Sequence, residues 1–216
     1  FLDVASNAGF LIAGLLGLYV ALRPGTRFVS DRERWPYALF FVGVLLTAWG
    51  SSYYHLAPDN ERLFWDRLPM TVAFMSLIAA QVADRVSVRA GLRLLIPLLL
   101  IGAASVIYWR MTERAGSGNL VPYALLQGYC VVVLLVIAAL FRSRYTHANA
   151  IYSVFAGYVV AKVCESFDHT LFAATGLVSG HTLKHLAAAV ASLIVCWMLW
   201  RRAPVAAPPP SSTVTG

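Results

Sequence analysis

Charged side chains are scarce in this chain. Only 12% of its 216 residues are Asp, Glu, Lys or Arg, while 59% are hydrophobic. A soluble domain usually has about one-quarter charged residues, so the composition excludes an ordinary soluble protein. A membrane-spanning helix needs roughly 20 apolar residues. The length therefore allows about seven such helices with short connections and leaves no room for a second domain.

Cysteine is also rare, and a metal motif built from it is missing. Cys130, Cys164 and Cys196 all lie in apolar runs, and no C-x2-C spacing occurs. We interpret them as small packing residues. The net charge is +7, but no basic soluble segment with interspersed aromatic residues is present. The sequence thus argues against nucleic acid as a partner and favours contact with membrane lipids.

The hydrophobic residues fall into seven long runs. Each run is bounded by charges, glycine or proline, and none shows the alternation of a β-barrel strand, so helices are expected. The runs cover residues 4–22, 36–56, 67–84, 91–109, 120–141, 149–172 and 181–200. The sequence predicts an all-α, polytopic membrane protein, a seven-transmembrane-helix bundle over residues 1–202. A tail rich in Pro, Ser and Thr, 203–216, is predicted to be disordered.

The arginines predict how the bundle is oriented. Eleven of them lie after the first, third and fifth runs or after the last run, at positions 23, 27, 32, 34, 85, 89, 93, 142, 144, 201 and 202. The other connections hold four, at positions 62, 67, 110 and 114. Since cytoplasmic connections carry the excess of basic residues, the C-terminus is predicted to be cytoplasmic and the N-terminus outside.

Five polar residues stand at the ends of the apolar runs, namely Ser51, His55, Asp66, His181 and His185. The predicted topology brings all five to one membrane depth, on the side of the N-terminus. Residues four apart share a helical face, so each S-x3-H or H-x3-H pair points one way. Three histidines can hold a catalytic metal with one open position. Asp66 is then suited to take a proton from bound water and Ser51 to donate a hydrogen bond to an oxyanion.

Other polar residues are less specific. Lys162, Glu165 and Asp168 share one face of the 149–172 run. They form either an internal ion-pair ladder or, near Asp168, support for the metal site or a substrate head group. His169 is a weaker candidate ligand, and Lys184 is interpreted as an interfacial residue on a different face from the two flanking histidines.

The motifs also resemble those of a known family. S-S-Y-Y-H at 51–55, W-D-R at 65–67 and S-G-H-T-L-K-H at 179–185 are similar to the alkaline ceramidase family. That family belongs to a superfamily of seven-helix hydrolases that includes the progestin and adiponectin receptors. The opening F-L-D-V-A-S-N-A-G-F-L-I-A-G-L-L-G-L resembles the first helix of bacterial ceramidase-like proteins.

This resemblance implies a zinc-dependent lipid amide hydrolase in a bacterial inner membrane. His55, His181 and His185 would bind Zn²⁺, Asp66 would hold the zinc-bound water, and Ser51 would support the transition state. The water would attack the amide carbonyl of ceramide, or of a related lipid amide, and release a fatty acid.

Two alternatives stay open at this point. A receptor-like or sensing membrane protein would use the metal structurally, and a closed site with Asp66 as fourth ligand would favour it. A transporter or proton path through Lys162, Glu165 and Asp168 would need polar residues across the whole membrane depth. The runs at 91–109 and 120–141 supply little beyond Ser105 and Gln127.

Overall fold

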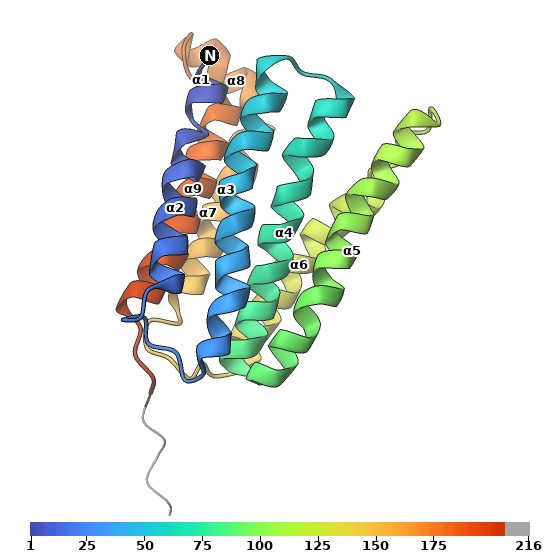
Figure 1. Cartoon of the computed structure of the whole chain (residues 1–216). Coiled ribbons are helices and arrows are strands. Elements are labelled where there is room, and N and C mark those ends of the chain that lie inside the picture. Colours follow the sequence, from blue (N-terminus) through green and yellow to red (C-terminus); the bar gives the residue numbers. More distant parts are fainter. Residues whose placement is uncertain (206–216) are drawn as a thin grey trace, which may run out of the picture.

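The computed structural model describes residues 1–205, and within this range the chain is all-helical with no β-strand. The helices are α1 (Leu2–Ala5), α2 (Ala8–Leu22), the 3-10 turn η1 (Asp31–Glu33), α3 (Arg34–Leu56), α4 (Asn60–Arg85), α5 (Val88–Arg114), α6 (Val121–Leu140), α7 (Ala150–Ser166), α8 (Asp168–Thr175) and α9 (Gly180–Arg201). The long helices run side by side, and α8 lies at the same end of the bundle as the N-terminus (Figure 1). The prediction of an all-α protein is confirmed.

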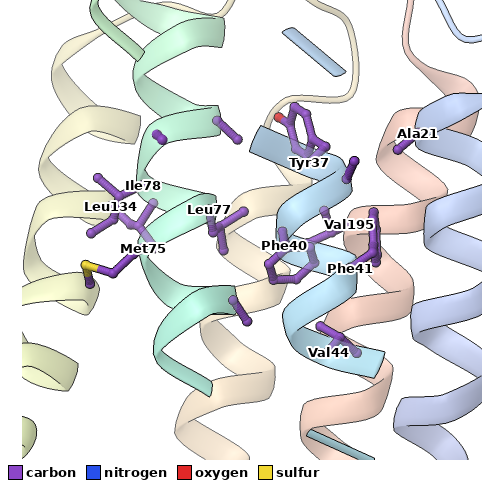
Figure 2. Packing of buried hydrophobic residues seen from close by; sticks show 14 of the residues in the cluster. Ala21, Tyr37, Phe40, Phe41, Val44, Met75, Leu77, Ile78, Leu134 and Val195 are labelled. Carbon is purple, nitrogen blue, oxygen red and sulfur yellow. The ribbon is translucent and has the colours of Figure 1, made fainter. Parts of the chain in front are cut away.

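The core lies where α2, α3, α4 and α9 meet. Phe41 of α3, Met75 of α4 and Val195 of α9 are almost completely buried. In Figure 2, Phe41 and Val195 lie on the side of α3 that faces away from α4, whereas Met75 lies on the side of α4 toward Leu134 of α6. Large apolar residues elsewhere face outward, for example Leu100 at 65% and Leu125 at 68% exposure. Such an apolar exterior is unfavourable in water and suits a bilayer.

Five helical segments are long and apolar enough to cross a membrane, or six when α7 and α8 count as one broken span. Every predicted apolar run overlaps a helix. The segment that falls outside this set is α3, which is 23 residues long. Its final turns hold polar residues, Ser51 and His55 among them, and these lower its mean hydropathy. The prediction of seven crossings stays a prediction.

The run at 149–172 does not form one straight helix. It is divided at Phe167 into α7 and α8, which are bent by 72° relative to each other. The break turns the start of α8 toward α9, where the Asp168 carboxylate accepts the backbone N–H of His181 at 2.7 Å. The irregularity therefore supplies a hydrogen-bond acceptor at the candidate site.

The opposite end of the bundle is fixed by buried charges. Asp84 of α4 accepts hydrogen bonds from Tyr37 at 2.6 Å and from Arg202 at 3.1 Å. Beyond α9, Ala203 and Val205 form backbone hydrogen bonds with Thr146 and Arg144, and Pro204 bridges Tyr145. The tail predicted to be disordered covers residues 203–216. Its first three residues form these contacts, and residues 206–216 lie outside the described residues.

Candidate metal centre

Three histidines from two helices meet at the end of the bundle that carries the N-terminus. His55 lies in the last turn of α3, and His181 and His185 lie in the first turns of α9. One ring nitrogen from each lies within 4.8 Å of the others. The ring centroids are 4.6 Å apart for His55 and His181, 4.6 Å for His181 and His185, and 5.3 Å for His55 and His185. The predicted juxtaposition of these histidines is confirmed, and the group could hold a metal ion.

The hydrogen bonds around His185 fit a ligand role. Its Nδ1 lies 2.9 Å from Oγ of Ser6, and that hydroxyl donates in turn to the carbonyl of Asp3 at 3.1 Å. With the hydroxyl proton directed at the Asp3 carbonyl, we assign Ser6 as the acceptor of Nδ1–H. This tautomer leaves Nε2 of His185 unprotonated and free to bind a metal. Metal-binding histidines usually donate their second N–H in this way.

His55 supplies a second test of fit. Its Nε2 is buried and has no hydrogen-bond partner among residues 1–205. A buried polar atom without a partner is costly, and a bound ion would satisfy it. The donor set thus fits a divalent metal that accepts imidazole nitrogen.

Within residues 1–205 the histidine group consists of three protein ligands. Among the residues that the structure describes, no further His, Cys, Asp or Glu joins the three histidines. Three protein ligands with one open position are typical of catalytic zinc sites, whereas structural zinc sites are closed by four. Asp66 is not part of the ligand group, so the feature that would favour a structural metal is not found.

Ser51 and Asp66 both lie beside this group. Ser51 is 1% exposed, and its Oγ lies 3.5 Å from Nε2 of His185. Asp66 of α4 lies close enough to interact electrostatically with His55 and with the Ser51 hydroxyl. Gly50 makes this approach feasible, because a Cβ there would collide with the carbonyl of Trp65 and contact Cα of Asp66. The five residues predicted from the sequence therefore gather at one place.

The start of α9 is held by several capping interactions. Ser179 accepts the backbone N–H of Thr182 at 3.0 Å, as an N-cap residue does. The Asp3 carboxylate accepts hydrogen bonds from the hydroxyls of Ser179 at 2.8 Å and Thr182 at 2.6 Å. Together with Asp168, these contacts satisfy donors at the helix start and fix the direction in which His181 and His185 point.

Sequence reasoning missed Ser6, Asp3 and Gly50. Ser6 and its partner His185 are 179 positions apart, and no motif spacing links them. The available signal was the presence of two polar residues near the start of the first apolar run, Asp3 just before it and Ser6 within it. His169 is exposed and is not part of the histidine group.

A cavity of about 520 Å³ adjoins the site. Apolar side chains such as Phe40, Phe74 and Leu77 form most of its wall, and Asp66 and His181 are among its polar lining residues. Two lysines also line it, and both are paired. Glu165 accepts from Lys162 at 2.7 Å and from Lys184 at 2.6 Å. The Lys162–Glu165 pair agrees with the ion-pair ladder, one of the two alternatives for these residues. Lys184 faces the cavity and Glu165, and its position at the membrane interface stays a prediction.

Comparisons of the chain with protein-family models, with curated proteins and with solved structures gave no match. The residues and the geometry of this chain are therefore the basis for inferring its function.

The Ser6 hydroxyl offers a test of the ligand role of His185. Ser6→Ala removes the acceptor for Nδ1–H, and we expect it to weaken zinc binding by about 10- to 100-fold, as loss of such outer partners does. The measurement is a competition titration of the purified protein against a fluorescent zinc chelator. Ser166→Ala is the control, because its hydroxyl also donates to a backbone carbonyl but is exposed and, within residues 1–205, is not a hydrogen-bond partner of the three histidines. Unchanged zinc affinity in Ser6→Ala would argue against His185 as a ligand.

Proposed function

We propose that the protein is a zinc-dependent intramembrane lipid amide hydrolase, similar in reaction to the alkaline ceramidases. The observation that carries this proposal is the open three-histidine group beside an apolar cavity of about 520 Å³ that His181 and Asp66 also line. A metal group and a cavity for hydrocarbon chains in one place are what such a reaction needs. The sequence resemblance described above points to the same chemistry.

His55, His181 and His185 would hold the ion. When bound, zinc supplies a Lewis acid for the carbonyl group and lowers the pKa of coordinated water to about 7. Asp66 accepts the proton that the attacking water loses, and later delivers it to the nitrogen of the leaving amine. Ser51 donates a hydrogen bond to the carbonyl oxygen as negative charge develops there. The C–N bond breaks, and a fatty acid and an amine are released.

The surroundings favour a lipid substrate over a soluble one. The cavity wall is mostly apolar, so it suits an acyl chain. The exterior of the bundle is apolar as well, which supports the arrival of substrates from the bilayer. Ceramide or another lipid amide therefore fits better than a peptide or a sugar.

We further propose seven membrane crossings, with α3 as the seventh. This helix packs against both α2 and α4, and its polar residues Ser51 and His55 face the site. Because cytoplasmic connections carry the excess of arginines, the C-terminus would lie in the cytoplasm. The metal group and the N-terminus would then lie on the outer side of a bacterial inner membrane.

The test is a screen of zinc-loaded, detergent-purified protein against ceramides, N-acylethanolamines and N-acyl amino acids, with fatty acid release measured by mass spectrometry. We expect release from at least one class and none after zinc is removed. A folded protein with one zinc per chain that hydrolyses no lipid amide or ester would overturn the enzymatic proposal. A receptor-like protein with a metal site would then be the better account.

A further inference from the structure

Four arginines lie at the site end of the bundle, and Arg67 differs from the other three. Arg62 pairs with Asp59 at 3.3 Å, and Arg110 and Arg114 both pair with Glu61. Arg67 takes part in no ion pair within residues 1–205. Its Nη1 atom is buried without a hydrogen-bond partner in the same part of the chain.

Aromatic rings hold this guanidinium in place. Cζ of Arg67 lies 4.4 Å from the ring centroid of Trp109 and 5.4 Å from that of Tyr123. Cation–π contacts position a cation, but they leave its N–H donors unsatisfied. Arg67 and its neighbour Asp66 both line the apolar cavity, where a charge without a counter-ion is costly. The cavity therefore presents an unpaired planar cation next to the proposed general base.

We propose that Arg67 binds a carboxylate of the substrate, so that the favoured substrates are N-acyl amino acids. The reaction rests on the proposed function, whereas the choice of ligand rests on Arg67. In an N-acyl amino acid a single carbon separates the amide nitrogen from the carboxylate. Asp66 and Arg67 both line the same cavity, and their charged groups are close enough to interact electrostatically although consecutive residues of a helix point in different directions. An amide near Asp66 thus places the carboxylate near Arg67, and the acyl chain occupies the apolar part of the cavity.

Guanidinium and carboxylate match in shape and charge. The planar fork of arginine can donate two parallel hydrogen bonds to one carboxylate. Lys184 is less suited to this task, because its ammonium group already pairs with Glu165 at 2.6 Å. A neutral head group, such as the alcohol of an ethanolamide, would leave Arg67 without a counter-ion.

The test compares N-oleoylglycine with N-oleoylethanolamide, which share the acyl chain and the amide and differ in the charged end. Binding to metal-free protein in detergent is measured by calorimetric titration, since a bound ion could itself attract the carboxylate. We expect the glycine conjugate to bind about 10- to 100-fold more tightly, the range for a charge-assisted hydrogen bond. Arg67→Gln should remove most of this preference, and Arg67→Lys should keep part of it. Arg114→Gln, a paired arginine at the same end, is the matched control and should keep it fully.

Equal affinity of the wild-type protein for both ligands would overturn the inference, and this comparison needs no variant that might fail to fold. A preference that survives Arg67→Gln would also overturn it. Hydrolysis by zinc-loaded protein is read separately. If the preference in binding is found but neither amide is cleaved, the ligand assignment stands and the proposed reaction fails. If both are cleaved and bound equally well, the reaction stands and the role of Arg67 fails.

Discussion

His181→Ala is expected to abolish both zinc binding and lipid amide hydrolysis. The side chain supplies one of three ligand nitrogens within 4.8 Å, and two histidines hold an ion far less well than three. Loss of a mere outer hydrogen-bond partner weakens metal binding by about 10- to 100-fold, so loss of a ligand should weaken it by more than about 100-fold. Metal content after gel filtration, measured by mass spectrometry, and fatty acid release on the same sample check this.

The matched control for this variant is His169→Ala. His169 is exposed in α8 and is not part of the histidine group, so its removal should leave one zinc per chain. If His181→Ala and His169→Ala retained equal zinc in folded protein, the metal would not be where we place it. Thermal unfolding of both variants in detergent shows that each is folded.

Asp66→Asn is expected to separate metal binding from catalysis. Asp66 is not in the ligand group, and asparagine keeps its shape, so zinc content should stay at one per chain. The amide cannot accept the proton that water loses, and general acid–base catalysis contributes about 10²- to 10⁴-fold. We therefore expect kcat to fall by about 10²- to 10⁴-fold with a small change in KM.

The control is Asp59→Asn at the same end of the bundle. Asp59 is exposed and caps α4 through the backbone N–H of Arg62, a role that asparagine also fills. Its kcat should match that of the wild-type protein. A fall in zinc content in Asp66→Asn would instead make Asp66 a ligand, and it would favour the closed, structural site.

Much of the fold could be predicted because hydropathy is a local signal. Each apolar run gives a helix, since lipid-like surroundings leave few other ways to satisfy the backbone. Two features could not be predicted from hydropathy, because they depend on residues distant in the sequence. These are the break in the run at 149–172 and the polar end of the run at 36–56. The break at Phe167 coincides with the hydrogen bond from the His181 backbone to Asp168, and the polar end of α3 contains Ser51 and His55, which face the site.

The candidate site was predictable to the extent that spacing and topology determine it. The S-x3-H and H-x3-H pairs each fix two side chains on one helical face, and alternating helix direction brings them to one end. The contribution of Ser6 to His185 and the contact of Gly50 with α4 are long-range packing facts. No local pattern encodes them, and they become visible only when the helices are placed in three dimensions.

Ion pairs between distant residues could not be predicted from local sequence patterns either. Arg62, Arg67, Arg110 and Arg114 look alike in the sequence as flanking basic residues, and only the folded chain separates Arg67 from the other three. The partner of Lys184 could not be predicted for the same reason, because Glu165 lies on a different helix. Charge counts predict orientation, but they do not predict which charge is left free.

The most direct test of the central claim is a zinc titration of metal-free wild-type protein, with fatty acid release from a lipid amide measured at each step. The account predicts no release without zinc, a linear rise with added zinc, and a plateau at one ion per chain. Full activity in the metal-free protein, or one bound zinc per chain with no release of fatty acid, would contradict it.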